Sequence, residues 1–280
     1  MVDALPSTGA PIVTVAMELS WGACSDPGAR RATNEDAYLV GTPVFLVADG
    51  MGGHAGGADA SRRAVESFRS LVGRRQVSAD DMRRAFEDAV AGVGEISSRS
   101  PAPGTTLSGV AVCEERGVPH WLVLNIGDSR TYRFLRGELD QISIDHSAVQ
   151  DLVDEGAISS AEAERHPQRH VITRAVGAGS AGLPDYWLLP VRHGERILVC
   201  SDGLPKEVPV EVITAVLASE LTASGAAQRL VREALARGGR DNVTVVVVDA
   251  RLSDAAAADD LNEDTVPRAP HPEEDERVEV

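Results

Sequence analysis

The chain has 280 residues, of which 43% are hydrophobic, and a formal net charge of −16 at pH 7. This composition predicts a globular protein, and the length allows one domain of about 240 residues with a large core. The negative charge argues against a nucleic-acid partner bound through its phosphates, and no apolar run approaches the roughly 20 residues that span a bilayer.

The net charge is concentrated at the C-terminus. From Asp254 onward there are ten acidic residues and two arginines, which account for half of it. The segment is rich in Ala, Asp, Glu and Pro, a composition that predicts disorder. We therefore expect a flexible N-terminus at 1–11, one folded domain at 12–251 and a disordered acidic tail at 252–280. The tail is most simply a solvated segment, and the alternative is a docking segment around Thr265.

The three cysteines, Cys24, Cys113 and Cys200, are odd in number and form no CxxC motif. We expect buried free thiols in a reducing compartment. No basic-then-apolar leader stands at the N-terminus. These features predict a cytoplasmic protein that binds neither a membrane nor nucleic acid, and we expect a monomer.

The first part of the chain predicts strands followed by two helices. Residues 12–23 alternate loosely as a first strand, and 37–48 indicate a hairpin bent at Gly41-Thr42-Pro43. Apolar residues recur at helical spacing over 57–72 and 79–98. Ser78 and Asp80 are the candidate caps of the second helix.

The rest of the chain continues with strands, two more helices and a last strand. The expected strands lie at 106–113, 119–126, 129–136, 142–144, 186–191, 196–200 and 243–248. The expected helical segments lie at 147–154, 160–165, 209–218 and 222–237. Because this order is not a regular βαβ alternation, it favours an α+β protein with antiparallel sheets and helices packed outside them.

Three aspartates stand where buried strands meet glycine turns. Asp49 ends the apolar run 44–48, Asp202 comes just after the run 197–200, and Asp241 precedes the run from Val243. Such positions are exposed at a sheet end but rigidly held, whereas a core would not tolerate unpaired carboxylates. Hard divalent cations favour carboxylate oxygens, so the three acids are candidate metal ligands. Asp128, after another apolar run and a glycine, is a fourth acid of the same kind.

Seven polar segments surround these acids in chain order. They are Arg31-Ala32-Thr33-Asn34-Glu35-Asp36, Asp49-Gly50-Met51-Gly52-Gly53-His54, Gly104-Thr105-Thr106-Leu107, Gly127-Asp128-Ser129-Arg130, Asp145-His146-Ser147, Cys200-Ser201-Asp202-Gly203-Leu204 and Asp241-Asn242-Val243-Thr244. In these segments, which span about residues 17–250, the chain resembles the bacterial type 2C metal-dependent serine/threonine protein phosphatases, the PPM family.

The resemblance implies a four-layer αββα sandwich, in which two mainly antiparallel sheets are flanked by helices. It also implies two Mn²⁺ or Mg²⁺ ions at one end of the sandwich, with a weaker third. By the same resemblance, Asp49 bridges both metals and the Gly50 carbonyl binds the first. Asp202 and Asp241 hold the second metal, and Asp128 marks the third, shared with Asp202.

The resemblance further assigns residues to the substrate. Arg31 matches the arginine that binds the substrate phosphate, and a planar guanidinium suits phosphate oxygens; its neighbour Arg30 is the alternative. Glu35 and Asp36 match acids that act on the metal-bound waters without touching the metals. Two cations reverse the repulsion between carboxylates and a phosphate and lower the pKa of a bridging water. The resulting hydroxide is expected to attack phosphorus directly, without a covalent enzyme intermediate.

Other polar residues have weaker assignments. His54 lies close to Asp49 and is a candidate proton donor to the leaving alkoxide. Animal members carry a histidine directly after the Asp-Gly pair, where this chain has Met51, so a loop histidine without a catalytic part is the alternative. His166 and His170 have the spacing of a helical metal pair. Pro167 between them disfavours a zinc site and leaves substrate contact as the better interpretation.

Two departures from the family pattern stand beside the site. Pro205-Lys206-Glu207 replaces small or acidic residues after the Asp-Gly-Leu motif, and Lys206 is the only lysine of the chain. Thr131 replaces a glycine after the Gly-Asp-Ser-Arg motif. Both changes are expected to affect substrate access without touching the metals.

The sequence therefore predicts a phosphatase that hydrolyses phosphoserine and phosphothreonine and opposes serine/threonine kinases. Its expected partners are phosphorylated proteins, namely such kinases and their substrates. A catalytically silent binding module with the same fold is the alternative from another class, and the complete set of acids favours the enzyme. A third hypothesis directs the same chemistry at one regulatory protein.

Overall fold

The computed structural model describes residues 17–52, 55–96, 102–163, 165–178 and 182–253. One sheet has five antiparallel strands. In spatial order they are β1 (Met17–Asp26), β12 (Val243–Leu252), β11 (Arg196–Cys200), β7 (Arg130–Leu135) and β8 (Glu138–Gln141). This sheet carries both ends of the described chain.

The second sheet has seven strands, also antiparallel. In spatial order they are β10 (Asp185–Pro190), β6 (Val118–Ile126), β5 (Leu107–Glu115), β3 (Val44–Met51), β4 (Gly104–Thr105) and β9 (Val176–Gly177), while β2 (Asp36–Gly41) pairs with β3. The two very short strands β4 and β9 were not predicted from the sequence. They extend the sheet only beside the end of β3.

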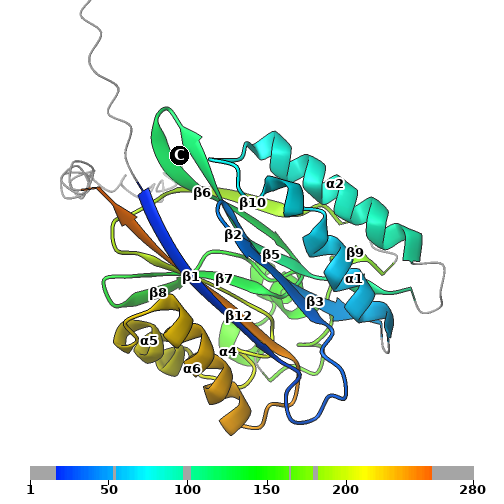
Figure 1. The fold of residues 1–280 in the computed structure, drawn as a ribbon. Coiled ribbons are helices and arrows are strands. Elements are labelled where there is room, and N and C mark those ends of the chain that lie inside the picture. Colours follow the sequence, from blue (N-terminus) through cyan, green and yellow to red (C-terminus); the bar gives the residue numbers. More distant parts are fainter. Residues whose placement is uncertain (1–16, 53–54, 97–101, 164, 179–181, 254–280) are drawn as a thin grey trace, which may run out of the picture.

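Helices cover the outer face of each sheet (Figure 1). α1 (Ala55–Glu66) and α2 (Ala79–Ile96) pack on the seven-stranded sheet. α5 (Val210–Ser219) and α6 (Ala223–Ala236) pack on the five-stranded sheet. A third core lies between the sheets. The predicted αββα sandwich is confirmed.

The strand alternation explains why the central strands are apolar throughout. On β3, Phe45 and Val47 enter the core between the sheets, whereas Leu46 and Ala48 enter the core under the helices. The side chains of β12 alternate in the same way, and Val246 and Val248 lie in the core between the sheets. Because successive side chains point to opposite faces, a strand buried on both sides needs a continuous hydrophobic run.

The prediction of a strand at 142–144 is wrong, since the structure has this strand at Glu138–Gln141. Leu135 pairs directly with Glu138, and the two residues between them have positive φ angles, 54° at Arg136 and 89° at Gly137. This is the geometry of a two-residue hairpin turn that matches the twist of its strands. β8 therefore starts immediately after the turn.

The helix expected at 57–72 ends earlier, at Glu66, and is followed by a 3₁₀ turn at Arg69–Leu71. Phe68 and Leu71 remain buried, which explains why the apolar spacing runs past the helix end. Ser78 caps α2: its hydroxyl accepts the amide of Asp81 at 3.1 Å, and Asp81 accepts the Ser78 amide in return.

The segment 145–183 has only the short strand β9 among its described residues. They contain α3 (Ala148–Asp154) and α4 (Ser160–Ala163). All three cysteines are free thiols, as expected, and Cys113 and Cys200 are buried. Among the described helices, none has both the length and the apolar content to cross a membrane.

Candidate metal centre

Asp49 stands at the end of β3 on the face that turns toward the other sheet, the same face as Phe45 and Val47. Its backbone is fixed on both sides by Thr106. The Asp49 amide donates to the Thr106 hydroxyl at 2.9 Å, and the Thr106 amide donates to the Asp49 carbonyl at 2.9 Å. The carboxylate is therefore presented by a rigid strand end between the two sheets.

Asp36 lies beside Asp49 because the two residues are direct partners in the β2–β3 register. Facing residues of an antiparallel pair share one side of the sheet. Ser201, from the opposite sheet, donates its hydroxyl to Asp36 Oδ2 at 2.7 Å. This hydrogen bond crosses the sandwich and joins the residue that follows β11 to the first residue of β2.

Asp202 and Asp241 come from neighbouring strands. Asp202 follows β11 and Asp241 precedes β12, and because these strands are antiparallel, both residues lie at the same end of the sheet. The two turns touch: a Cβ on Gly203 would lie 2.0 Å from the Asn242 carbonyl oxygen. Only glycine permits this approach.

Asp128 is positioned by the turn before β7. Gly127 has φ 101°, and its amide donates to His146 Nδ1 at 3.2 Å. Since Nδ1 accepts this hydrogen bond, the ring proton is on Nε2, which lies 3.0 Å from Asp185 Oδ2. The buried His146 thus holds the turn that carries Asp128, a positioning role that the sequence did not reveal.

Burial and, after it, mutual repulsion raise the pKa values of the clustered acids. Burial raises the pKa of Asp36 to about 7, with further contributions from the charges of Asp202 and Asp241. Burial and the Asp202 charge also raise the pKa of Asp128 to about 7. The pKa of Asp49 is raised well above its ordinary value, first by burial and then by the negative charges of the other four aspartates. Such a cluster is stable in its charged form only with added positive charge.

The cluster has oxygen atoms available for cations. Among the buried atoms of the described residues, Asp36 Oδ1, Asp128 Oδ1 and Asp202 Oδ1 have no hydrogen-bond partner. Buried carboxylate oxygens without partners are costly and suit hard cations such as Mn²⁺ or Mg²⁺. The donor set therefore fits the expected metals.

The cluster is nonetheless not closed around a metal position. In the part of the chain that the structure describes, no three His, Cys, Asp or Glu side chains form a ready-made metal site. Two basic side chains lie among the acids. Arg31 pairs with Asp241, and Lys206 contacts Asp202 Oδ2, so both acids expected on the second metal already have a cation partner.

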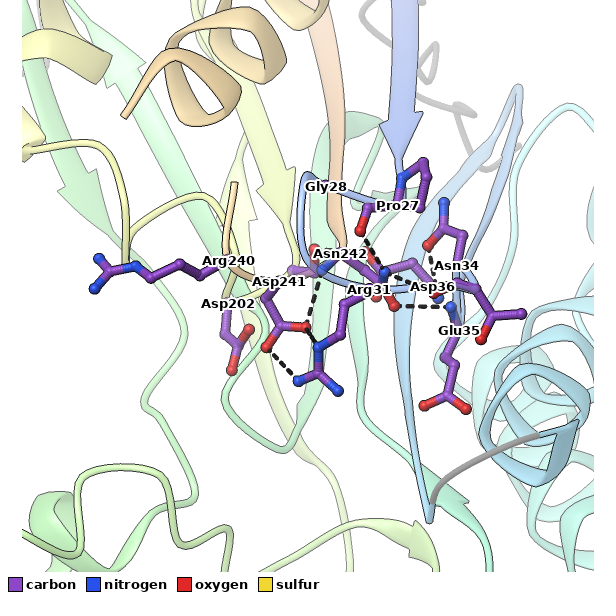
Figure 2. A network of polar contacts seen from close by, with 12 residues as sticks. Pro27, Gly28, Arg31, Asn34, Glu35, Asp36, Asp202, Arg240, Asp241 and Asn242 are labelled. Carbon is purple, nitrogen blue, oxygen red and sulfur yellow. Dashed lines mark hydrogen bonds and ion pairs between the residues drawn. The ribbon is translucent and has the colours of Figure 1, made fainter. Parts of the chain in front are cut away.

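Arg31 projects from the loop between β1 and β2. Its Nε lies 2.9 Å from Asp241 Oδ1 and its Nη2 lies 3.0 Å from Oδ2 (Figure 2). The side chain is 53% exposed, so the guanidinium stands at the solvent side of the cluster.

Asn242 holds this loop in place. Its Oδ1 accepts the amide of Glu35 at 2.8 Å, and its Nδ2 donates to the carbonyls of Pro27 and Thr33 at 2.9 and 3.0 Å. One buried side chain thus fastens the segment that bears Arg31, Glu35 and Asp36 to the start of β12 (Figure 2). The sequence placed Asn242 in a motif but assigned it no role.

Glu35 lies against the start of α1. A Cβ on Gly57 would come within 3.0 Å of Glu35 Oε2, and a Cβ on Gly50 would lie 2.6 Å from the Glu35 carbonyl oxygen and 2.2 Å from that of Gly57. The glycines at 50 and 57 therefore allow the loop, the end of β3 and the helix to meet.

Two further histidines, His54 and His170, were named as candidates from the sequence. His54 lies outside the described residues. His170 is exposed, and its pKa is lowered by partial burial and by the charges of Lys206 and Arg169, against the opposing effect of Asp202 and Asp241.

Of the two departures from the family pattern, Thr131 is structural. Its hydroxyl lies 3.0 Å from that of Ser108, and both residues are buried between the sheets. Lys206, in contrast, enters the acidic cluster itself.

An antiparallel αββα sandwich with a carboxylate cluster at one end is the arrangement expected of a metal-dependent phosphatase, and comparison with known proteins agrees. The family model described as Protein phosphatase 2C matches residues 29–237. The chain belongs to the protein phosphatase 2C family.

Two curated relatives are both serine/threonine phosphatases. PstP of Mycobacterium tuberculosis is 41% identical over 241 residues, which cover 84% of this chain and 46% of PstP. The chain thus spans about half the length of that relative. The phosphatase stp of Listeria monocytogenes is 31% identical over 243 residues, which cover 82% of this chain and 95% of stp.

A solved structure of the PstP catalytic domain in complex with two manganese ions superposes with a TM-score of 0.73 at 36% identity. The match covers 84% of this chain and 100% of that domain.

Proposed function

We propose that this chain is a metal-dependent phosphatase that hydrolyses phosphoserine and phosphothreonine in proteins. The observation that carries the proposal is the meeting of Asp49, Asp128, Asp202 and Asp241, from both sheets, at one end of the sandwich. Membership of the protein phosphatase 2C family supports it, as does the naming of its relatives as serine/threonine phosphatases.

Asp49, Asp202 and Asp241 are the proposed ligands of two Mn²⁺ or Mg²⁺ ions, whereas Asp128 stands at the outer position that the resemblance assigns to a weaker third ion. Asp49 and the Gly50 carbonyl would hold the first ion, and Asp49 would hold the second together with Asp202 and Asp241. When bound, the ions offset the negative charge of the cluster and supply the activation of the attacking water. Asp36 and Glu35 are proposed to act on the metal-bound waters, through proton transfer and hydrogen bonds, without contacting the metals.

Arg31 is the proposed phosphate-binding residue. Its guanidinium is exposed, and its two-point pairing with the Asp241 carboxylate demonstrates that it can present two parallel N–H groups to a pair of oxygens. A phosphate offers the same geometry. His54 remains the proposed proton donor to the leaving alkoxide.

The alternative is a binding module that has the fold but no activity. Such a module has no need to keep several mutually repelling carboxylates at one place, because each costs stability in the absence of metal. The complete set of acids therefore favours the enzyme.

The test is Mn²⁺-dependent release of phosphate from a phosphothreonine peptide by the full chain. Release that requires Mn²⁺ and is lost in Asp49→Asn and Asp241→Asn is the expected result. Absence of release at every Mn²⁺ concentration contradicts the activity, whereas equal release by the variants contradicts the site.

Phosphorylated proteins are the proposed substrates, with serine/threonine kinases and their targets as the proposed partners. We further propose that the chain acts in the cytoplasm as a monomer. A kinase co-expressed with the active chain should lose its phosphothreonine signal, and co-expression with Asp49→Asn should leave that signal intact.

A further inference from the structure

Lys206 contacts the acidic cluster directly. Its ammonium group pairs with Oδ2 of Asp202, four residues earlier. The Asp202 side chain is only 12% exposed and that of Lys206 is 32% exposed. This pair therefore differs from the mobile, fully solvated ion pairs that contribute little to a protein.

The turn that carries Lys206 is fixed on both sides. The Lys206 amide donates to the Asp202 carbonyl at 3.1 Å, and the Val208 amide donates to the Leu204 carbonyl at 2.9 Å. The next residue, Glu207, has a side chain that is only 4% exposed, and it accepts hydrogen bonds from Arg240 at 2.8 and 3.0 Å. The backbone that carries the lysine is thus held in place.

The ammonium faces more than one acid. Burial opposes its charge, but the charges of Asp202, then Asp128, then Asp49 raise the pKa of Lys206 above its ordinary value. In return, the lysine lowers the pKa of Asp128, against the larger effect of burial. The direct contact is with Asp202, so the positive charge lies at that carboxylate.

Two features of Asp128 and Asp202 suit the binding of a cation. As whole residues, Asp128 and Asp202 are 7% and 9% exposed, and the Oδ1 atoms of both lack a hydrogen-bond partner among the described residues. An ammonium is a compact charge with three donors, closer to a metal ion than a planar guanidinium is. The chain uses arginine for every other permanent cation, and its only lysine stands here.

We propose that the Lys206 ammonium is a built-in cation of the cluster, which pairs with Asp202 and thereby keeps a further ion out of the outer position between Asp202 and Asp128, so that the chain is limited to two metal ions. The inference rests on the proposed metal centre. It implies that a divalent ion can enter this outer position only when the lysine is removed.

The test is a count of Mn²⁺ bound per chain, measured on the full chain by equilibrium dialysis with elemental analysis and by EPR of the bound ion. The wild type should bind about two ions, as does the related PstP domain. Lys206→Met, which keeps most of the aliphatic stem, should gain one further, weaker ion. Asp128→Asn in the Lys206→Met background should remove the gained ion, and Asp128→Asn alone should leave the wild-type count unchanged.

Two further variants separate charge from folding. Lys206→Arg should stay at the wild-type count because it keeps a positive charge. Arg237→Gln, which removes the cation of another i,i+4 pair at the end of α6, should also have no effect. A thermal melt of each variant identifies any that fail to fold, and Lys206→Gln serves as the second variant if Lys206→Met does so.

Three outcomes are distinguishable. An additional ion in Lys206→Met that depends on Asp128 supports the inference. An unchanged count in folded Lys206→Met and Lys206→Gln overturns it, as does tighter binding of the same two ions without a third, since the lysine would then only compete with them. A wild type that binds no Mn²⁺ contradicts the proposed metal centre itself.

Discussion

Arg31 and Asp241 form a two-point ion pair between side chains 210 residues apart in the sequence. The residue proposed to bind the phosphate is thus held by a residue proposed to bind a metal. A cation at Asp241 competes with the guanidinium for the same two oxygens. Metal binding is therefore expected to release Arg31 toward the position where the phosphate enters.

Replacing Arg31 with alanine should mainly weaken substrate binding. A charge-assisted, two-point hydrogen bond contributes about 1.5–3 kcal/mol, so KM for a phosphothreonine peptide should rise roughly tenfold to a hundredfold with a smaller effect on kcat. Steady-state kinetics at saturating Mn²⁺ measure this. Arg30→Ala, which removes the neighbouring exposed arginine, is the matched control, and an equal rise in both variants would indicate a general loss of positive charge.

Arg31→Ala should also change the metal requirement. Because the variant removes the competitor for Asp241, Mn²⁺ should bind more tightly and reach half-saturation at a lower concentration than in the wild type. Isothermal titration without substrate measures this independently of catalysis. A weaker Mn²⁺ affinity in Arg31→Ala would contradict the competition.

The metal-free protein should lose stability as the pH rises from about 4 to about 7. Asp36 and Asp128 have pKa values raised to about 7 in the folded state, whereas an unfolded aspartate titrates near 3.9. The folded state therefore binds more protons than the unfolded state in this window, and each proton contributes at most about 1.4 kcal/mol per pH unit. Urea unfolding of chelator-treated protein at pH 5.5 and 7.5 measures the slope.

Asp128→Asn identifies the origin of this slope. The amide cannot ionise, so the variant should be more stable than the wild type at pH 7.5 without metal and should have a shallower slope. Saturating Mn²⁺ should oppose the slope in the wild type because the metal binds the ionised carboxylates. If Asp128→Asn has the same slope as the wild type, the ionisation of Asp128 is not its cause.

Much of the fold follows from periodicity in the sequence. The continuous apolar runs at β3 and β12 predicted strands buried on both faces, and the structure confirms them. The strand β8 was predicted at the wrong place because it follows a turn with a positive φ angle at Arg136. An arginine gives no indication in the sequence of such a backbone angle. β4 and β9 have two residues each, too few to show any periodicity.

In the site, too, some residues could be predicted from the sequence and others could not. Strand-end acids were visible because an acid beside an apolar run and a glycine is a local pattern. The roles of Asn242 and His146 were not, since each depends on hydrogen bonds to residues distant in the sequence, such as Glu35 and Asp185. The Lys206–Asp202 contact had a local signal in its four-residue spacing, but only the structure shows that it points into the cluster.

Replacing Asn242 should loosen the loop that carries Arg31. Asn242→Ala leaves the Glu35 amide and the Pro27 and Thr33 carbonyls without their partner, and a buried group without a hydrogen bond costs about 1–3 kcal/mol. We expect a loss of at least about 2 kcal/mol in urea unfolding together with a higher KM. Asn242→Asp keeps the acceptor for Glu35 but loses both donated bonds. A KM unchanged in both variants would show that the loop is held by other contacts.

Adding a methyl group at Gly50 should disrupt the metal centre through backbone contacts. A Cβ there would lie 2.2 Å from the Gly57 carbonyl oxygen and 2.6 Å from that of Glu35, and neither backbone atom can yield without moving α1 or the loop. Gly50→Ala should therefore lower both the unfolding midpoint and the Mn²⁺ affinity. Gly92→Ala is the matched control: the glycine lies within α2 with nothing within 4 Å of the added atom, so the change should stabilise the protein by roughly 0.5–1 kcal/mol. Normal Mn²⁺ binding by Gly50→Ala would show that this glycine is not needed to shape the site.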